Sequence, residues 1–502
     1  MASTPPVGPD TAPPDPPAPA DVRAFDRPMV SSMAWTGAVK WTLAVFTWVA
    51  TIIVARLLLP ADYGLIGMAG ILIGLVAIFS EFGLGITVVT LRDLTRTQIA
   101  QLNGLAVVLA AISVGLCALL AIPAGSFFRA PALPLVIVVL SASFLISSLR
   151  LVPAALLQRD LQFRTLALIE GAQGLIQSVT TITLAWTGFG YWALVFGPIV
   201  GQLVATTLVL SQRRAAMRIP RRRTLGPALT FTRHQITGTL AWYAYSNSDF
   251  LIAGRVLGQA SLGVYSIAFT LARAIPEKVS TLVVRVTPAF FSAVQSEPAA
   301  LRRYLLRLTE YLAMLTFPAL AGLALVANDV VRLIGPQWEA AVLPLRLLAI
   351  YAAFEGVLQL VSRVLTATRR SRFLMYDGLA LAVIMPLGFL VGSRWGVGGI
   401  AAVWLILYPV TRIPALRAMR QMTGLGIGQY LAAYRPALAG CVGMAVSVLG
   451  LQHVMPAWDL IPRLAAQALV GAAVYAAIIG AAFPDRIRGL RDLVRQIRGP
   501  AG

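Results

Sequence analysis

Charged and polar side chains set within long apolar runs are the residues of this sequence that could do chemistry. A charge at the centre of a bilayer costs about 2.5–3.5 kcal/mol on insertion scales, so such residues in apolar helices point to a substrate pathway. Aromatic, amide and hydroxyl groups suit sugar rings, whereas lysine and arginine suit phosphate oxygens. The candidate substrate-binding residues are Lys40, Thr47, Arg150, Trp242, Tyr245, Asp249, Arg273, Lys278, Arg285, Glu355, Gln359 and Arg363.

Helical spacing places several candidates on shared faces. Lys40 and Thr47 lie on one face of a helix near the N-terminus. Tyr245, Ser246 and Asp249 lie on one face of a second helix. An internal repeat makes Thr47 and Ser246 equivalent, because they are 199 residues apart. We therefore expect the two helix faces to lie opposite each other across a water-filled cleft.

Two later helices carry charges at similar spacing. Lys278 and Arg285 are seven residues apart, and Glu355, Gln359 and Arg363 follow one another at steps of four. The alternative for each candidate is a structural ion pair, either between two helices or one turn apart within a helix.

The composition sets the environment in which these residues work. The chain has 502 residues, of which 58% are apolar and 12% charged, against about 25% charged in soluble domains. So few charges cannot coat a water-facing surface, which excludes a soluble enzyme and a disordered chain. The sequence therefore predicts an all-α, polytopic membrane protein, because these apolar runs are too long for barrel strands.

Apolar runs of about 20 residues recur along the chain and predict about fourteen transmembrane helices. The expected spans are 33–58, 64–90, 99–122, 131–157, 165–187, 190–211, 230–257, 262–291, 303–334, 340–367, 373–393, 397–416, 434–454 and 462–483.

Arginines concentrate in one alternate set of the predicted loops, including the run 213–223. The positive-inside rule then places both termini in the cytoplasm. The net charge of +21 is explained by this topology, so no nucleic-acid partner is needed. Arg56 and Arg255 fall near the opposite boundary and are expected to be snorkelling anchors. Gly197 and Gly201 predict close helix packing.

The chain also resembles itself. Residues near Arg56 match residues near Arg255, and the segment Leu133–Leu135 matches Leu343–Leu345 in the same order. This predicts two parallel six-helix repeats that rock about a cleft, as in alternating access, plus two C-terminal helices. The expected parts are a disordered cytoplasmic tail at 1–28, a first lobe at 29–212, a basic cytoplasmic linker at 213–229, a second lobe at 230–420, two extra helices at 421–484 and a basic amphipathic tail at 485–502.

Several chemistries find no support in the sequence. There is no GxxxxGK[ST] phosphate loop, so ATP hydrolysis by that route is excluded. Cys117 and Cys441 are isolated, and His234 and His453 have no metal-ligand spacing. We therefore expect no cofactor, no metal site and no enzymatic activity.

Four segments resemble a known family. ARLLLPADYGL at 55–65, FSEFGLG at 79–85, LQRDLQFR at 157–164 and DFLIAGRVLG at 249–258 are similar to the polysaccharide-transporter family of bacterial lipid-linked oligosaccharide flippases. The similar branch is the colanic-acid-exporter-like one of lipopolysaccharide biosynthesis, within the multidrug/oligosaccharidyl-lipid/polysaccharide exporter superfamily. The resemblance implies movement of undecaprenyl-diphosphate-linked oligosaccharide across the inner membrane for exopolysaccharide, capsule or O-antigen. It also implies membrane lipids and other polysaccharide-assembly proteins as partners.

Three alternatives stay open at this point. A cation-coupled multidrug antiporter shares the superfamily, but it would be expected to show acidic sites, whereas the candidates here mix both signs of charge. A lipid II flippase shares the predicted helix count. An O-antigen polymerase or ligase is an enzyme and usually needs a large periplasmic loop, which this sequence does not predict.

Overall fold

The computed structural model describes residues 46–81, 83–91, 93–220, 239–240, 242–293, 297–368, 370–455, 458–486 and 488, without the side chains of 278–293, 367 and 371. Every element in these ranges is a helix, which confirms the predicted all-α class. The expected tail at 1–28, Lys40, most of the linker at 213–229 and most of the tail at 485–502 lie outside the described residues.

The first half of the chain forms a group of long helices. A short apolar helix, Phe46–Leu57, comes first. It is followed by α2 (Pro60–Glu81), α3 (Leu84–Thr90), α4 (Arg96–Phe128), α5 (Leu133–Arg159), α6 (Phe163–Trp186) and α7 (Trp192–Gln212).

The second half begins with a helical segment at 242–246. The elements after it are α9 (Ser248–Ile252), the π-helix η1 (Ala253–Leu257), α10 (Gln259–Ala293), α11 (Pro298–Leu325), α12 (Ala327–Ile334), η2 (Pro336–Ala341), α13 (Val342–Ala367), α14 (Ser371–Gly392), η3 (Ser393–Trp395), α15 (Gly396–Thr411) and α16 (Ile413–Thr423). The chain ends in α17 (Ile427–Ala432), α18 (Arg435–Val454) and α19 (Leu460–Ala482).

Nine helical stretches of the described chain are long and apolar enough to cross a membrane. The longest of them, 372–423, contains α14, α15 and α16, which were predicted as two spans. The multi-pass membrane protein is thus confirmed, while the count of fourteen stays a prediction.

Local sequence explains where several helices begin and end. Thr95 caps α4, because its hydroxyl accepts from the Gln98 N–H at 3.2 Å while the Gln98 side chain accepts from the Thr95 N–H at 2.8 Å. Gly83 has φ 62° and separates α2 from α3, and Gly424 has φ 66° and ends α16. Glycine adopts this left-handed conformation without the steric cost of a Cβ.

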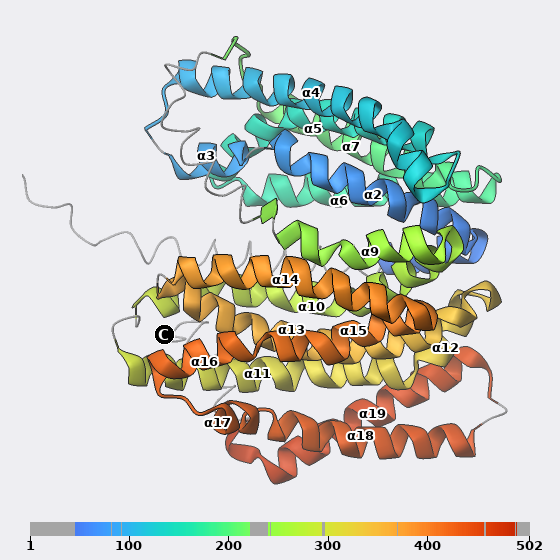
Figure 1. Ribbon diagram of the computed structural model, residues 1–502, viewed down its shortest axis with the longest axis vertical. Coiled ribbons are helices and arrows are strands. Elements are labelled where there is room, and N and C mark those ends of the chain that lie inside the picture. The colour runs from blue at the N-terminus through green and yellow to red at the C-terminus, as the bar shows by residue number, and fades with distance from the viewer. Residues whose placement is uncertain are drawn as a thin grey trace, which may run out of the picture.

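The two halves of the chain and the C-terminal helices follow one another as groups along the longest axis of the molecule (Figure 1). Helices α4, α5 and α7 lie at one end of the longest axis, α10, α13 and α15 lie in the middle, and α18 and α19 lie at the far end. The largest apolar core crosses the first two groups and includes Leu65, Met68, Tyr265 and Trp338. The junction between α2 and α10 is therefore part of the core.

Candidate functional site

The backbones of α2 and α10 touch where both helices begin. A Cβ atom at Gly64 would overlap the carbonyl oxygen of Gln259, and one at Gly263 would overlap that of Pro60. The repeat offset of 199 relates Pro60 to Gln259 and Gly64 to Gly263. The two contacts are thus equivalent under the repeat, because in each one a glycine of one helix meets the first carbonyl of the other helix.

A second reciprocal pair lies at the same end. The Trp338 indole Nε1 donates to the Ala55 carbonyl oxygen at 2.8 Å, and the Phe128 ring packs on Gly254. The offset of 199 relates Ala55 to Gly254, and the second repeat block, with an offset of 210, relates Phe128 to Trp338. These contacts and the α2–α10 contacts together are called the seam below.

Two arginines also cross the seam. Arg56 Nε donates to the Leu333 carbonyl oxygen at 2.6 Å, and the Arg255 guanidinium carbon lies 5.3 Å from the Phe127 ring centroid. The expected role of Arg56 and Arg255 as snorkelling anchors stays a prediction. Both residues bind the other half of the chain.

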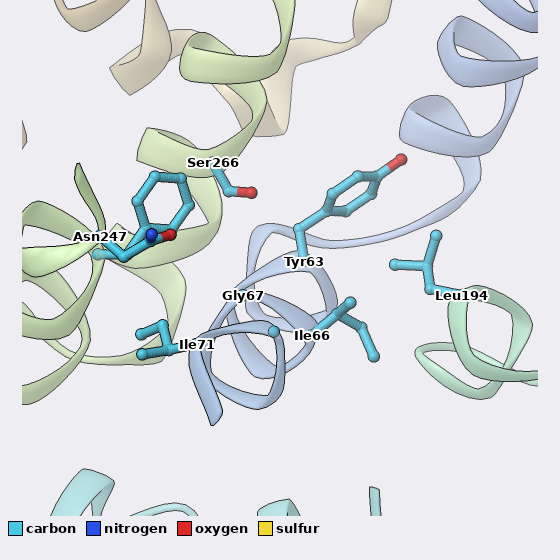
Figure 2. A pocket seen from close by; sticks show the side chains of 9 residues that line it. Tyr63, Ile66, Gly67, Ile71, Leu194, Asn247 and Ser266 are labelled. Carbon is cyan, nitrogen blue, oxygen red and sulfur yellow. The ribbon is translucent and has the colours of Figure 1, made fainter. Parts of the chain in front are cut away.

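A cavity of about 380 Å³ lies beyond the seam, between α2, α7, α10 and residues 247–250. Its polar lining includes Tyr63, Asn247 and Ser266. Figure 2 shows Asn247 on one side of the cavity and Tyr63 and Leu194 on the other. The cavity is therefore lined by both halves of the chain.

Tyr243 and Asn247 were missed by the sequence prediction. The Tyr243 hydroxyl donates to the Ile71 carbonyl oxygen at 2.8 Å and packs against Gly74 of α2. The Tyr243 side chain therefore faces α2, and Asn247 lines the cavity that α2 borders. The predicted face contains Trp242, Tyr245 and Ser246, whereas the face that meets α2 contains Tyr243. The helix is then interrupted by a turn at Asn247.

The predicted candidates on this helix lie elsewhere. Trp242 is 52% exposed and Tyr245 is half-buried. Asp249 is completely buried, and its Oδ2 accepts from the Tyr265 hydroxyl at 2.6 Å and from Trp404 Nε1 at 2.9 Å. This network joins α9, α10 and α15, so Asp249 holds the second half of the chain together.

A second polar cluster joins α10 to α13. Arg273 NH2 pairs with Glu355 Oε1 at 2.7 Å, and Gln359 Nε2 donates to the same oxygen at 3.2 Å. The alternative of an interhelical ion pair therefore describes Arg273 and Glu355. Arg363, two turns beyond Glu355 on α13, is half-buried and has no ion-pair partner among the residues that the structure describes.

The remaining candidate substrate-binding residues lie in separate parts of the structure. Arg150 NH1 donates to Gln173 Oε1 at 3.1 Å within the first half of the chain. Thr47 is exposed on the first helix. Lys278 and Arg285 lie on α10, but their side chains are outside the described part of the structure. The substrate roles of these residues stay predictions.

An ion pair that the sequence did not single out lies near the end of α15. Arg412 donates to both carboxylate oxygens of Asp377, at 2.9 and 3.3 Å. No group of three or more potential metal-binding side chains occurs within the described ranges. The glycine prediction agrees with the structure, because a Cβ at Gly197 would overlap the Thr181 side chain of α6.

Comparison with known sequences decides the family. The family described as "Polysaccharide biosynthesis protein" matches residues 53–343, which run from the first described helix through the seam and into α13. The chain belongs to this family. The resemblance drawn from the four sequence segments is confirmed.

The names of two similar proteins are compatible with this family. The chain is 23% identical over 416 residues to the lipopolysaccharide biosynthesis protein WzxC of Escherichia coli (strain K12), covering 80% of this chain and 83% of that protein. It is 24% identical over 359 residues to the teichuronic acid biosynthesis protein TuaB of Bacillus subtilis (strain 168), covering 66% and 72% respectively.

Solved structures support the fold. The lipid II flippase MurJ in an inward closed conformation matches with a TM-score of 0.67 at 13% identity, covering 92% of this chain and all of that one. An inward-facing multidrug resistance MATE family transporter matches with a TM-score of 0.57 at 13% identity, covering 78% and 99%. This family member therefore has the transporter fold that both structures share.

Proposed function

We propose that this protein is a flippase that moves an undecaprenyl-diphosphate-linked oligosaccharide across the bacterial inner membrane for polysaccharide biosynthesis. The family match and the names of the curated relatives support a role in handling polysaccharide precursors. No bond needs to be made or broken in the cargo, so the proposal includes no catalytic residue.

The proposed mechanism rests on the reciprocal packing at the seam. Residues related by the repeat contact one another across α2 and α10, as expected for two parallel repeats around an axis along the membrane normal. We assign residues 29–212 and 230–420 to two rocking lobes, with extra helices at 421–484. The tails at 1–28 and 485–502 and the linker at 213–229 are assigned to the cytoplasmic side.

The polar candidates lie away from the seam. Arg273 is 14 residues along α10 from Gln259, about 20 Å at the helical rise of 1.5 Å per residue. Arg363 is 21 residues along α13 from Val342, about 30 Å by the same measure. If the seam is at the periplasmic end, as the arginine distribution predicts, these cations lie toward the cytoplasm, where the cargo is made.

The cargo's chemistry suits this arrangement. We assign Arg363 to the diphosphate, because an arginine without a carboxylate partner in the described structure is free to bind phosphate oxygens. The cavity residues Tyr63, Asn247 and Ser266 offer hydroxyl and amide groups to sugars. The lipid tail stays in the bilayer, and other polysaccharide-assembly proteins supply and consume the cargo.

Deletion of the gene tests the function. We expect lipid-linked repeat units to accumulate on the cytoplasmic face and surface polysaccharide to be lost, with both restored by the gene on a plasmid. Sensitivity to cationic dyes with normal polysaccharide would instead support a multidrug antiporter. Loss of peptidoglycan with normal polysaccharide precursors would support a lipid II flippase.

A further inference from the structure

A second cavity, of about 560 Å³, lies far from the seam, where α11 and α18 begin and α19 ends. Helix α17 and the end of α16 mark this end of the molecule in Figure 1. We call this cavity the basic pocket. Its lining residues are Ala299, Arg302, Arg303, Leu306, Arg307, Glu310, Gln429, Ala432, Ala433, Arg435, Pro436, Phe483 and Arg486.

The lining is strongly cationic, with five arginines and one glutamate. Glu310 is 8% exposed at its side chain and pairs with Arg486 Nε at 2.8 Å. Arg303, Arg307 and Arg435 are exposed and have no ion-pair partner in the part of the chain that the structure describes. Like charges gathered in one cavity repel one another, so an anion that enters it is stabilised by several of them at once.

Polar geometry within the pocket also fits an oxyanion. Arg302 NH2 donates to Gln429 Oε1 at 2.8 Å, which ties the first turns of α11 to α17 and orients the guanidinium. Arginine presents a planar fork of N–H donors that matches phosphate oxygens. A pocket of this volume is in the size range of sites for organic ligands, about 300–1,000 Å³, and exceeds the needs of one small anion.

The apolar residues of the lining favour the headgroup of a lipid over a free phosphate ion as the ligand. Leu306, Pro436 and Phe483 line the same pocket as the arginines. Pro436 and Phe483 lie at the ends of helices that are long and apolar enough to cross a membrane, and Leu306 lies in the third turn of α11. Lipid headgroups meet water at the ends of such helices. A basic pocket between such helices is a typical site for an anionic lipid headgroup.

We propose that the basic pocket binds the phosphate-bearing headgroup of an anionic phospholipid, which ties the two C-terminal helices to α11. The site is separate from the proposed cargo path and does not depend on which glycan is carried. Bound lipid stabilises the folded protein by mass action, because it occupies a site that the unfolded chain lacks.

The test is a lipid titration of the purified full-length protein in neutral-detergent micelles. Dioleoylphosphatidylglycerol is expected to raise the unfolding temperature in a saturable way, and dioleoylphosphatidylcholine is not. The double variant Arg303→Gln/Arg307→Gln should bind dioleoylphosphatidylglycerol about thirtyfold more weakly, since each basic residue near an anionic lipid contributes roughly fivefold. The matched control, Arg417→Gln/Arg420→Gln, removes two exposed arginines of α16 outside the pocket and should bind like the parent.

A third variant guards against a simple loss of folding. Glu310→Gln removes the one acidic side chain of the described lining and should tighten lipid binding several-fold. Equal weakening in both double variants would overturn the proposal in favour of general surface attraction. Equal stabilisation by inorganic diphosphate at matched phosphate concentration would overturn it in favour of a free-anion site.

Discussion

At the scale of single residues, the structure divides the charged candidates into those that have partners and those that do not. Asp249 is held by Tyr265 and Trp404, and Glu355 is held by Arg273 and Gln359. Removing one member of a buried polar network leaves the others unpaired, so their loss would damage folding as well as function. These residues are therefore poor tests of the cargo path.

Arg363 is the better test at this scale. We expect Arg363→Ala to reduce flipping at least tenfold and Arg363→Lys to retain part of it, because lysine keeps the charge but loses the planar fork. The measurement is the appearance of a fluorescent polyprenyl-diphosphate oligosaccharide in the outer leaflet of proteoliposomes. Arg332→Ala, an exposed arginine of α12, is the matched control and should flip at the parental rate.

Normal flipping by Arg363→Ala would remove this residue from the cargo path. The same assay applies to Lys278→Ala and Arg285→Ala, whose roles rest on sequence spacing. Unchanged flipping in both would leave α10 without a cationic contact to the cargo.

At the scale of elements, sequence predicts helices well and their mutual orientation poorly. Long apolar runs require helices in lipid, because every backbone group must be paired within the segment. This local requirement is why α4, α5 and α18 occur where they were expected. The prediction also succeeded at Gly197, where a small residue at helical spacing allows close approach.

The faces of interrupted helices could not be predicted in this way. The segment around Asp249 contains a turn at Asn247 and a π-helix at Ala253–Leu257. The turn at Asn247 interrupts the regular period of 3.6 before Asp249, which lies inside the second half, whereas Tyr243 before the turn faces α2. Likewise, the pairing of Arg273 with Glu355 joins distant residues, which periodicity does not reveal.

The α2–α10 contact yields a prediction at this scale. Gly64→Ala and Gly263→Ala should each destabilise the closed seam by about 1–3 kcal/mol, because the added methyl group meets a backbone carbonyl that cannot rotate away. The unfolding temperature in detergent should fall in both variants. Gly70→Ala, in the same helix α2 with no atom within 4 Å of the added carbon, should match the parent. Similar melting of all three variants would contradict this account.

At the scale of the whole molecule, the proposed cycle requires the seam to open. The hydrogen bond from Trp338 to the Ala55 carbonyl and the bond from Arg56 to the Leu333 carbonyl join the two halves of the chain. A neutral hydrogen bond contributes about 0.5–1.5 kcal/mol net, so losing one shifts a two-state equilibrium by roughly twofold to tenfold.

Labelling of the cavity tests this shift. In a background with Cys117 and Cys441 replaced, Ser266→Cys places a thiol in the cavity beyond the seam. We expect Trp338→Phe to raise the rate of labelling by an impermeant maleimide from the periplasm by twofold to tenfold. Trp395→Phe, at an indole that is 71% exposed, should leave the rate unchanged. A rate insensitive to Trp338→Phe would show that this contact does not hold the closed state.

The reciprocity of the seam also bears on how such a protein could arise. The contacts at the seam have the pattern of an isologous interface. In such an interface, two identical subunits related by a two-fold axis contact each other through the same surface. Pro60 against Gly263 and Gln259 against Gly64 still satisfy that symmetry. A shorter ancestral polypeptide inserted in one orientation could therefore have assembled the same pair from two copies before a gene fusion joined them.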